Sequence, residues 1–465
     1  MFKKIYFLEK GFFMKSKIVI IIGMISLTVY AFFVGCKSTP HYTLAQFISP
    51  ATCGGCHDEI YEQWKNSMHN LAQKDIIYKE FAAFYLDEIK KQNPINKDEL
   101  EEAESCVKCH IPVGYITGKP LTVTEELAME NELPEITKEG IQCDFCHVIV
   151  DAKKKYNAHF TYKPGNGEAD PGVKRGPFKD STPDWHQAAY SKFHTQSAFC
   201  GTCHDVRHVV YGTKLETTFE EWTKSPYNTG DEKTSVPCQG CHMYHRPGVP
   251  ATGSTPRPNN PGFAAFGGPQ RDHIFTHYFV GGNSVIPALY NDKIKGQMAQ
   301  ERLKNAATIM IDTRDISTGA FAVTVINTGA GHKLPTGLTD VRQMWLEIVI
   351  MSQYGREVFA IGKADKKGYL PDNTIIFKTI FGDGNGKPVV NIAKAKEILF
   401  DNRILPKESV TNTIVLPKGL KGKFTIQVRL LYRLADQKTV NEVMKDKAVT
   451  LPVIEMATAK KDIVL

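Results

Sequence analysis

The residues best suited to chemistry in this sequence are its cysteines, because ten of the eleven belong to five copies of one pentapeptide, Cys-x-x-Cys-His. The cysteines are Cys53, Cys56, Cys106, Cys109, Cys143, Cys146, Cys200, Cys203, Cys238 and Cys241, and the histidines are His57, His110, His147, His204 and His242. This pentapeptide is typical of haem c attachment. Its thiols bond to the porphyrin, and its histidine is the proximal ligand of the iron. The sequence therefore predicts five covalently attached haem c groups.

Two other interpretations of the motif explain less. A redox-active dithiol does not need a histidine after every second cysteine. Zinc sites built from two CxxC pairs would leave the fifth pair without a partner.

The eleventh cysteine, Cys36, lies where an export signal would end. Basic residues within 15–17 precede 17 uncharged residues, 18–34, and Gly35 comes directly before Cys36. A basic segment, an apolar segment and a small residue before the cut are typical of a secretory signal peptide. The last four of these residues resemble a bacterial lipobox.

We therefore expect residues 1–35 to be a lipoprotein-type signal peptide and Cys36 to be lipidated, with Met14 as an alternative start. An uncleaved anchor is the other possibility, since the 17 uncharged residues are near the short limit of a membrane span. Either way the sequence predicts an exported protein: a periplasmic, outer-membrane or cell-surface lipoprotein.

The net charge argues against nucleic acid as a partner. It is +7 and falls to +3 without residues 1–35, which carry five lysines and one glutamate. Haem propionates outnumber ferric charges, so the oxidised holoprotein is expected to be near neutral or slightly acidic. With 42% hydrophobic and 23% charged residues, the chain is neither disordered nor a polytopic membrane protein.

The elements that must hold the motifs change in type along the chain. Residues 36–307 are expected to form a pentahaem domain, mainly α-helical and irregular with a haem-filled core, including helices over 59–70 and 100–109. Residues 308–465 alternate apolar and polar positions between turn signals, and Tyr354-Gly355 marks a hairpin. This pattern predicts an all-β, immunoglobulin-like sandwich.

Part of the haem region has the appearance of a duplication. Residues 62–69, which end Trp-Lys-Asn-Ser-Met-His, are echoed by residues 220–227, which end Trp-Thr-Lys-Ser-Pro-Tyr. Tyr227 stands in the second copy where His69 stands in the first. The second copy is therefore expected to take its iron ligand from elsewhere.

Several segments resemble the cytochrome c-554/c-552 family of multihaem cytochromes. Residues 53–69, with Trp64, Ser67 and His69 after the first motif, are similar to the opening of that family. Later segments of the same relatives are similar to residues 193–206 and 221–243. Residues 327–337 contain Gly-His-x-x-Pro-Thr-Gly, which resembles a signature of multihaem lipoproteins with a C-terminal sandwich.

A soluble electron carrier needs a second strong ligand on each iron, and ten histidines lie outside the motifs. The resemblance implies that His69, His186, His194 and His277 are distal ligands. We add His332, which lies in a glycine-flanked turn of the expected β-domain and would attach that domain to a haem. The alternative for His332 is a hydrogen bond to the backbone of its own turn. The remaining candidates are His159, His208, His245 and His273.

These features predict a lipid-anchored pentahaem cytochrome that relays electrons at the cell envelope rather than an enzyme. Its partners would be other cytochromes, a quinol-linked donor or an extracellular acceptor, and the membrane through the lipid. Two alternatives stay open. One is a reductase or oxidase with one open-site haem, for nitrite, hydroxylamine or a sulfur oxyanion; the other is a subunit of a larger cytochrome complex or polymer.

Overall fold

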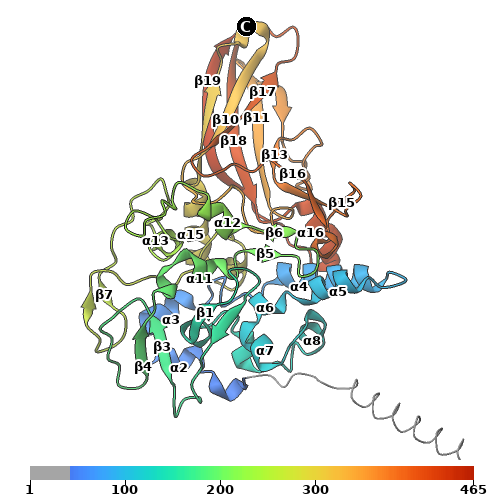
Figure 1. The fold of residues 1–465 in the computed structure, drawn as a ribbon. Coiled ribbons are helices and arrows are strands. Elements are labelled where there is room, and N and C mark those ends of the chain that lie inside the picture. The colour runs from blue at the N-terminus through green and yellow to red at the C-terminus, as the bar shows by residue number, and fades with distance from the viewer. Residues whose placement is uncertain (1–41) are drawn as a thin grey trace, which may run out of the picture. The chain divides into compact units, whose positions relative to one another are not determined.

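The computed structural model describes residues 42–465. The predicted signal peptide, Met14 and the lipidation site Cys36 lie outside the described residues. Among residues 42–465, no helix is both long enough and apolar enough to cross a membrane. The first part of this range is helical and irregular, and the last part consists mainly of strands (Figure 1).

The longest helix, α4 (Ile76–Lys90), shows why helices form in the first part. Asp75 caps it, because the Oδ1 atom accepts hydrogen bonds from the backbone N–H groups of Ile77 and Tyr78 at 2.8 and 3.3 Å. One face is apolar at helical spacing, and its buried residues are Ile77, Phe81, Ala82, Tyr85, Leu86 and Ile89. That face forms part of the core.

The two helices expected over 59–70 and 100–109 are shorter than predicted. Helix α3 (Asp58–Trp64) ends early because Asn66 has a positive φ of 56° and the side chain of Asn70 accepts its N–H at 2.9 Å. The second segment is divided into α5 (Lys97–Glu104) and α6 (Val107–His110). The first turn comes just before His69, and the second comes at the start of the motif that begins with Cys106.

Each Cys-x-x-Cys-His motif contains or adjoins one short turn of helix. In four motifs the histidine N–H donates to the carbonyl of the first cysteine at 2.8–3.1 Å. One helical turn places the two thiols and the imidazole close together, which is what attachment to one porphyrin requires. The five turns are α2 (Pro50–Gly54), α6, α10 (Cys143–His147), α11 (Ser197–Gly201) and α13 (Gln239–His242).

Short elements connect these turns. The helices are η1 (Leu44–Gln46), α7 (Pro112–Thr117), α8 (Val123–Ala128), α9 (Glu135–Lys138), η2 (Phe193–Thr195), α12 (Thr218–Thr223), α14 (Ile286–Leu289) and α15 (Lys293–Lys304). Four two-stranded sheets pair β1 (Ile149–Ala152) with β2 (Phe160–Tyr162), β3 (Val173–Gly176) with β4 (Gln187–Tyr190), β5 (Val206–Arg207) with β6 (Lys214–Glu216), and β7 (Gly262–Phe263) with β8 (Gln270–Arg271).

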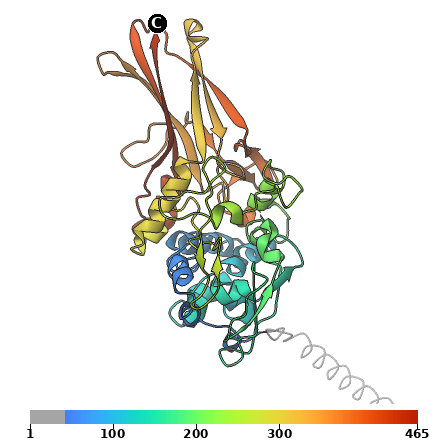
Figure 2. The same cartoon turned by 90° about the vertical axis from the view of Figure 1, so that its left-hand side faces the viewer.

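Strands dominate from residue 307 onward, and they extend away from the helical part (Figures 1 and 2). One sheet has the order β17 (Ser409–Val415), β10 (Ala320–Asn327), β9 (Ala307–Asp312). A second has the order β12 (Glu357–Ile361), β11 (Gln343–Ser352), β18 (Lys423–Arg433), β19 (Ile454–Val464), with β13 (Ile376–Phe377) also paired to β11. A third joins β15 (Pro388–Val389), β14 (Thr379–Gly382) and β16 (Glu397–Asp401). The remaining helices here are η3 (Ile316–Thr318), η4 (Ile392–Lys394), α16 (Gln437–Met444) and η5 (Lys445–Lys447).

The predicted change from helical to strand-rich structure is confirmed. Alternate residues of β10 are buried, and β11 and β12 form the predicted hairpin around Gly355, whose φ is +74°. Inward residues of the β17–β10–β9 sheet and of the five-stranded sheet share one apolar cluster, which includes Phe321, Val323, Val325, Ile348, Ile350, Ile426 and Val428. The sheets are open, however, and the immunoglobulin-like sandwich stays a prediction.

A second apolar cluster connects the strand-rich region to the helices. It contains Phe81 and Ile89 of α4 together with Ala393 of η4 and Val440 and Met444 of α16. Residues 43–465 accordingly form one compact unit. The domain boundary predicted between residues 307 and 308 stays a prediction.

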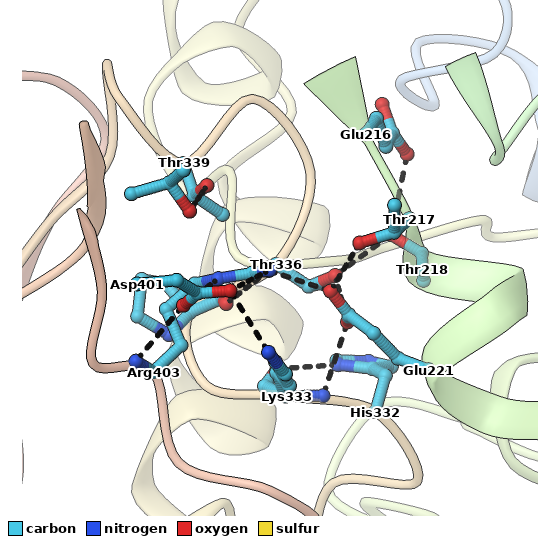
Figure 3. Close-up of polar contacts among 12 residues, drawn as sticks. Glu216, Thr217, Thr218, Glu221, His332, Lys333, Thr336, Thr339, Asp401 and Arg403 are labelled. Carbon is cyan, nitrogen blue, oxygen red and sulfur yellow. Dashed lines mark hydrogen bonds and ion pairs between the residues drawn. The ribbon is translucent and has the colours of Figure 1, made fainter. Parts of the chain in front are cut away.

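A buried carboxylate makes a further connection, between α12 and the loop after β10 (Figure 3). Glu221 accepts hydrogen bonds from the Lys333 N–H at 3.1 Å and the Thr336 hydroxyl at 2.8 Å. Its other oxygen accepts from Arg403 at 2.6 Å, and Arg403 also pairs with Asp401. The side chains of Glu221 and Arg403 are only 4% and 6% exposed. The loop is therefore held by a desolvated ion pair.

We expect Glu221→Ala to lower the free energy of unfolding by about 3 kcal/mol, because removing one partner of a buried ion pair leaves desolvated groups unsatisfied. The matched control is Glu62→Ala, whose carboxylate pairs with Lys65 at the surface, where the two side chains are 67% and 49% exposed. This control should cost less than about 1 kcal/mol. Urea denaturation of the two holoprotein variants measures the difference, and equal losses would contradict the expectation.

Candidate functional site

All five motif histidines have one ring nitrogen fixed by a hydrogen bond. Four donate from Nδ1 to a backbone carbonyl: His57 to Ala264 (2.6 Å), His110 to Ala72 (2.9 Å), His147 to Arg175 (2.5 Å) and His242 to Val280 (3.4 Å). The fifth, His204, donates to the carboxylate of Glu216 at 3.2 Å. Metal-binding histidines are commonly fixed in this way, which leaves Nε2 for the metal. At His242, Nε2 accepts a hydrogen bond from Arg302 at 3.4 Å in this structure.

Second imidazoles lie beside three of these histidines. The ring centres of His57 and His186 are 6.4 Å apart, and those of His204 and His69 are also 6.4 Å apart, with interplanar angles of 26° and 20°. Two imidazoles that bind one metal ion through bonds of about 2 Å have ring centres roughly 6 Å apart. The spacing therefore fits an iron between each pair of rings.

The third such histidine, His147, lies beside two of the predicted distal ligands. His194 is 5.8 Å away and His277 is 6.5 Å away, measured between ring centres. Nδ1 of His277 donates to the Phe275 carbonyl at 2.9 Å, which leaves its Nε2 available. Nε2 of His194 instead contacts the Cys146 carbonyl at 3.0 Å. His277 is therefore the better fit to the iron of the third motif.

His332 lies close to the fifth motif. It is near enough to His242 for the two rings to interact electrostatically. Burial lowers the pKa of His242, and the charges of Arg302 and His332 lower it further. Nδ1 of His332 donates to the Lys333 carbonyl at 2.9 Å, so Nε2 is again available. Both roles considered for His332 are thus compatible, because the backbone hydrogen bond uses the nitrogen that an iron would not need.

His110 of the second motif differs from the other four. Its ring stacks on Tyr78, with centres 3.7 Å apart. Within residues 42–465, no second histidine ring lies beside it in the way that His186 lies beside His57. Nearby, the buried Tyr85 hydroxyl and Asp340 Oδ1 have no hydrogen-bond partner among the described residues. Burial raises the pKa of Asp340 to about 6. The five predicted distal histidines therefore gather at four motifs.

The motif cysteines lie next to one another across the fold. Three pairs of thiols are close enough to hydrogen bond: Cys53 with Cys143, Cys109 with Cys203, and Cys200 with Cys238. The Cys146 thiol is also near Cys200 and Cys203. Every motif is thus adjacent to another, and the motif around Cys200 and Cys203 is adjacent to three.

The expected duplication has a structural counterpart. The indole N–H of Trp64 donates to the Ile141 carbonyl at 2.8 Å, and that of Trp222 donates to the Val236 carbonyl at 2.9 Å. Each acceptor lies two residues before a motif cysteine. In the same way, the carbonyls of His69 and Tyr227 accept from the N–H groups of Ile141 and Val236. His69 and Tyr227 therefore occupy equivalent places.

The remaining candidate histidines have other partners. His208 is buried and donates from Nε2 to the Ala393 carbonyl at 2.9 Å. His245 lies between Glu301 and Arg302 at 3.4 Å from each. His273 stacks on Tyr244, and His159 lies against Tyr156 on the surface.

Sequence reasoning missed Glu216 as a partner of His204. The strands that bring it back to the motif, β5 and β6, have two and three residues. In strands this short, apolar and polar residues show no detectable alternation. The sequence signal for a reversal of the chain here is therefore limited to the turn residue Gly212.

Two of three comparisons with known proteins gave matches. Residues 52–148 match the family model described as "Cytochrome c554 and c-prime". The fold is similar to that of a penta-heme cytochrome c552 from Thermochromatium tepidum, with a TM-score of 0.59 and 19% identity over 90% of this chain and 100% of that chain. No curated protein matches. Three of the five motifs lie inside the segment that the family model matches, so the predicted resemblance to multihaem c-type cytochromes of the cytochrome c-554 family is confirmed over residues 52–148.

Proposed function

We propose that this protein is a pentahaem cytochrome that relays electrons between redox partners. The observation that carries the proposal is that the motif cysteines form an unbroken series of neighbouring thiols. The series runs from Cys53 and Cys143 through Cys146 to Cys200, Cys203 and their neighbours. Thioether bonds would attach each porphyrin edge at its cysteines. Neighbouring thiols therefore imply neighbouring porphyrins, and a relay needs them to be close together.

Haem c supplies the one-electron chemistry when it is bound. The chain's own residues would fix and shield it. The proximal histidines are oriented by the hydrogen bonds of their Nδ1 atoms, and His69, His186, His277 and His332 present a second imidazole at four motifs. A site with two fixed imidazoles changes little on reduction, which favours rapid electron exchange.

The proposed place of action is the cell envelope. Its support is the sequence before residue 42: the basic and apolar segments, Gly35 and Cys36. A lipid on Cys36 would hold the protein at a membrane face as a periplasmic, outer-membrane or cell-surface lipoprotein. There it would exchange electrons with other cytochromes, a quinol-linked donor or an extracellular acceptor.

We also propose that the strand-rich region is an immunoglobulin-like sandwich that completes the fifth site. Its support is the apolar cluster shared by the β17–β10–β9 sheet and the five-stranded sheet. The loop that carries His332 leaves this region and is attached to α12 through Glu221 (Figure 3). The sandwich would thus supply a ligand as well as a scaffold.

One observation favours a second function, an oxidoreductase with an open haem at the second motif. Catalysis at haem needs a free coordination position beside acid or base groups. His110 lacks a paired imidazole among the described residues, and Tyr85 is near enough to Cys106 and Asp340 for their charges, after burial, to raise its pKa. A small oxyanion or hydroxylamine would be the class of substrate.

The spin states of the oxidised holoprotein separate the two functions. We expect low-temperature EPR to show four low-spin haems and one high-spin haem, because among residues 42–465 only His110 of the proximal histidines lacks a second imidazole. The reduced protein should bind one equivalent of CO. If all five haems are low-spin and none binds CO, the second function is excluded and the relay alone remains. Two or more CO equivalents would contradict the assignment of distal ligands.

His332→Ala tests the ligand from the strand-rich region. The holoprotein variant should bind one more equivalent of CO than the wild type, because the iron of the fifth motif loses its second imidazole. His159→Ala is the matched control, since the His159 ring is exposed and lies edge-on against Tyr156, away from the motif histidines with which the distal candidates pair. Equal CO binding by both variants would show that His332 has only its backbone role.

A further inference from the structure

The acceptor of the Nδ1 hydrogen bond distinguishes His204 from the other four proximal histidines. Those four donate to main-chain carbonyls, which are neutral. His204 donates to Glu216, whose carboxylate oxygen Oε1 is 3.2 Å from Nδ1. The Glu216 side chain is 15% exposed, so water screens its charge only in part.

The chain builds this contact with a hairpin. Strands β5 and β6 pair Val206 with Glu216, which returns Glu216 to the neighbourhood of His204. His208 fixes the connecting loop, because its Nδ1 accepts the N–H of Tyr211 at 3.2 Å while its Nε2 donates to Ala393 at 2.9 Å. The hairpin is therefore anchored to the rest of the protein and holds the carboxylate in place.

A hydroxyl pair continues from the carboxylate (Figure 3). The Thr218 hydroxyl is 3.3 Å from Oε1 of Glu216 and 2.7 Å from the Thr336 hydroxyl. Thr336 donates its hydrogen to Glu221, which also accepts the N–H of Lys333 next to His332. The single hydroxyl hydrogen of Thr218 is then donated either to Glu216 or to Thr336, and the other contact is a close approach of oxygens. The partner of one proximal histidine is thus connected to the loop of a predicted distal histidine.

A carboxylate acceptor makes the imidazole a stronger electron donor than a carbonyl does, because a charge-assisted hydrogen bond pulls the Nδ1 proton more strongly. A more basic ligand stabilises the ferric state and lowers the reduction potential of the haem. We propose that Glu216 sets a lowered potential for the haem attached at Cys200 and Cys203. This inference rests on the proposed relay. Since this motif is adjacent to three others, its potential would control how electrons divide among them.

The test is Glu216→Gln in the full-length holoprotein, with a spectroscopic redox titration. Gln keeps the size of the side chain and removes its charge. We expect one of the five one-electron steps to move to a more positive potential, by about 59 mV if the ratio of reduced to oxidised haem rises tenfold. A Cys203→Ser variant identifies which step belongs to this haem.

Glu220→Gln is the matched control, because it removes the same charge from a nearby carboxylate that pairs with Lys214, Lys224 and Arg207 and, among residues 42–465, has no hydrogen bond or ion pair with a histidine. An equal shift in this control, or no shift in Glu216→Gln, would overturn the proposal. A shift of all five steps would also overturn it, because the effect would then be a general change of structure.

A second variant guards against poor folding. Glu216→Asp keeps the charge but shortens the side chain, so the same step should move upward by less than in Glu216→Gln. A larger shift in Glu216→Asp would contradict the charge argument. Failure of the relay itself is separate: wild-type protein would then take up electrons in titration but not pass them to an oxidised cytochrome on mixing.

Discussion

The hydrogen bond at Nδ1 of each imidazole is the interaction on which the rest of this structure depends. An imidazole binds iron through one nitrogen and can rotate unless the other is held. In this chain the holders are mainly carbonyls from loops remote in sequence, such as Ala264 for His57 and Val280 for His242. Loops with little regular structure are therefore part of the metal sites, and their course is fixed by the need to reach an imidazole.

Much of this architecture could be predicted from the sequence because it is local. The motif turns follow from the spacing of two cysteines and a histidine, and the strands β10 and β18 follow from alternating apolar and polar residues, which match their alternating burial. Non-local features could not be predicted in the same way. The proximity of His69 to His204, or of His110 to Tyr78, depends on tertiary packing that no short pattern records. Counting histidines suggested enough ligands for every haem, but it could not show that two of them, His194 and His277, meet at one motif.

The duplicated tryptophans show how a repeated scaffold can diverge at the point of chemistry. Trp64 and Trp222 make equivalent hydrogen bonds, yet the positions that follow hold His69 and Tyr227. His69 lies beside the proximal histidine of the fourth motif, whereas the Tyr227 hydroxyl has no partner among residues 42–465. The strand-rich region offers His332 near the fifth motif instead. A ligand supplied by His332 would leave the scaffold of the repeat unchanged, because no residue of the repeat would have to change its backbone position.

The order of the paired imidazoles along the chain has a consequence for biogenesis. A polypeptide is synthesised from its N-terminus, and its early segments begin to fold first. His69 is already present when His204 is made, but His57 precedes His186, His147 precedes His277, and His242 precedes His332. No pair can close until its later member has been synthesised, and in three of the four that later member is the predicted distal histidine. The attachment of haem at the early motifs would therefore precede the completion of their iron coordination, and the last closure would await the strand-rich region.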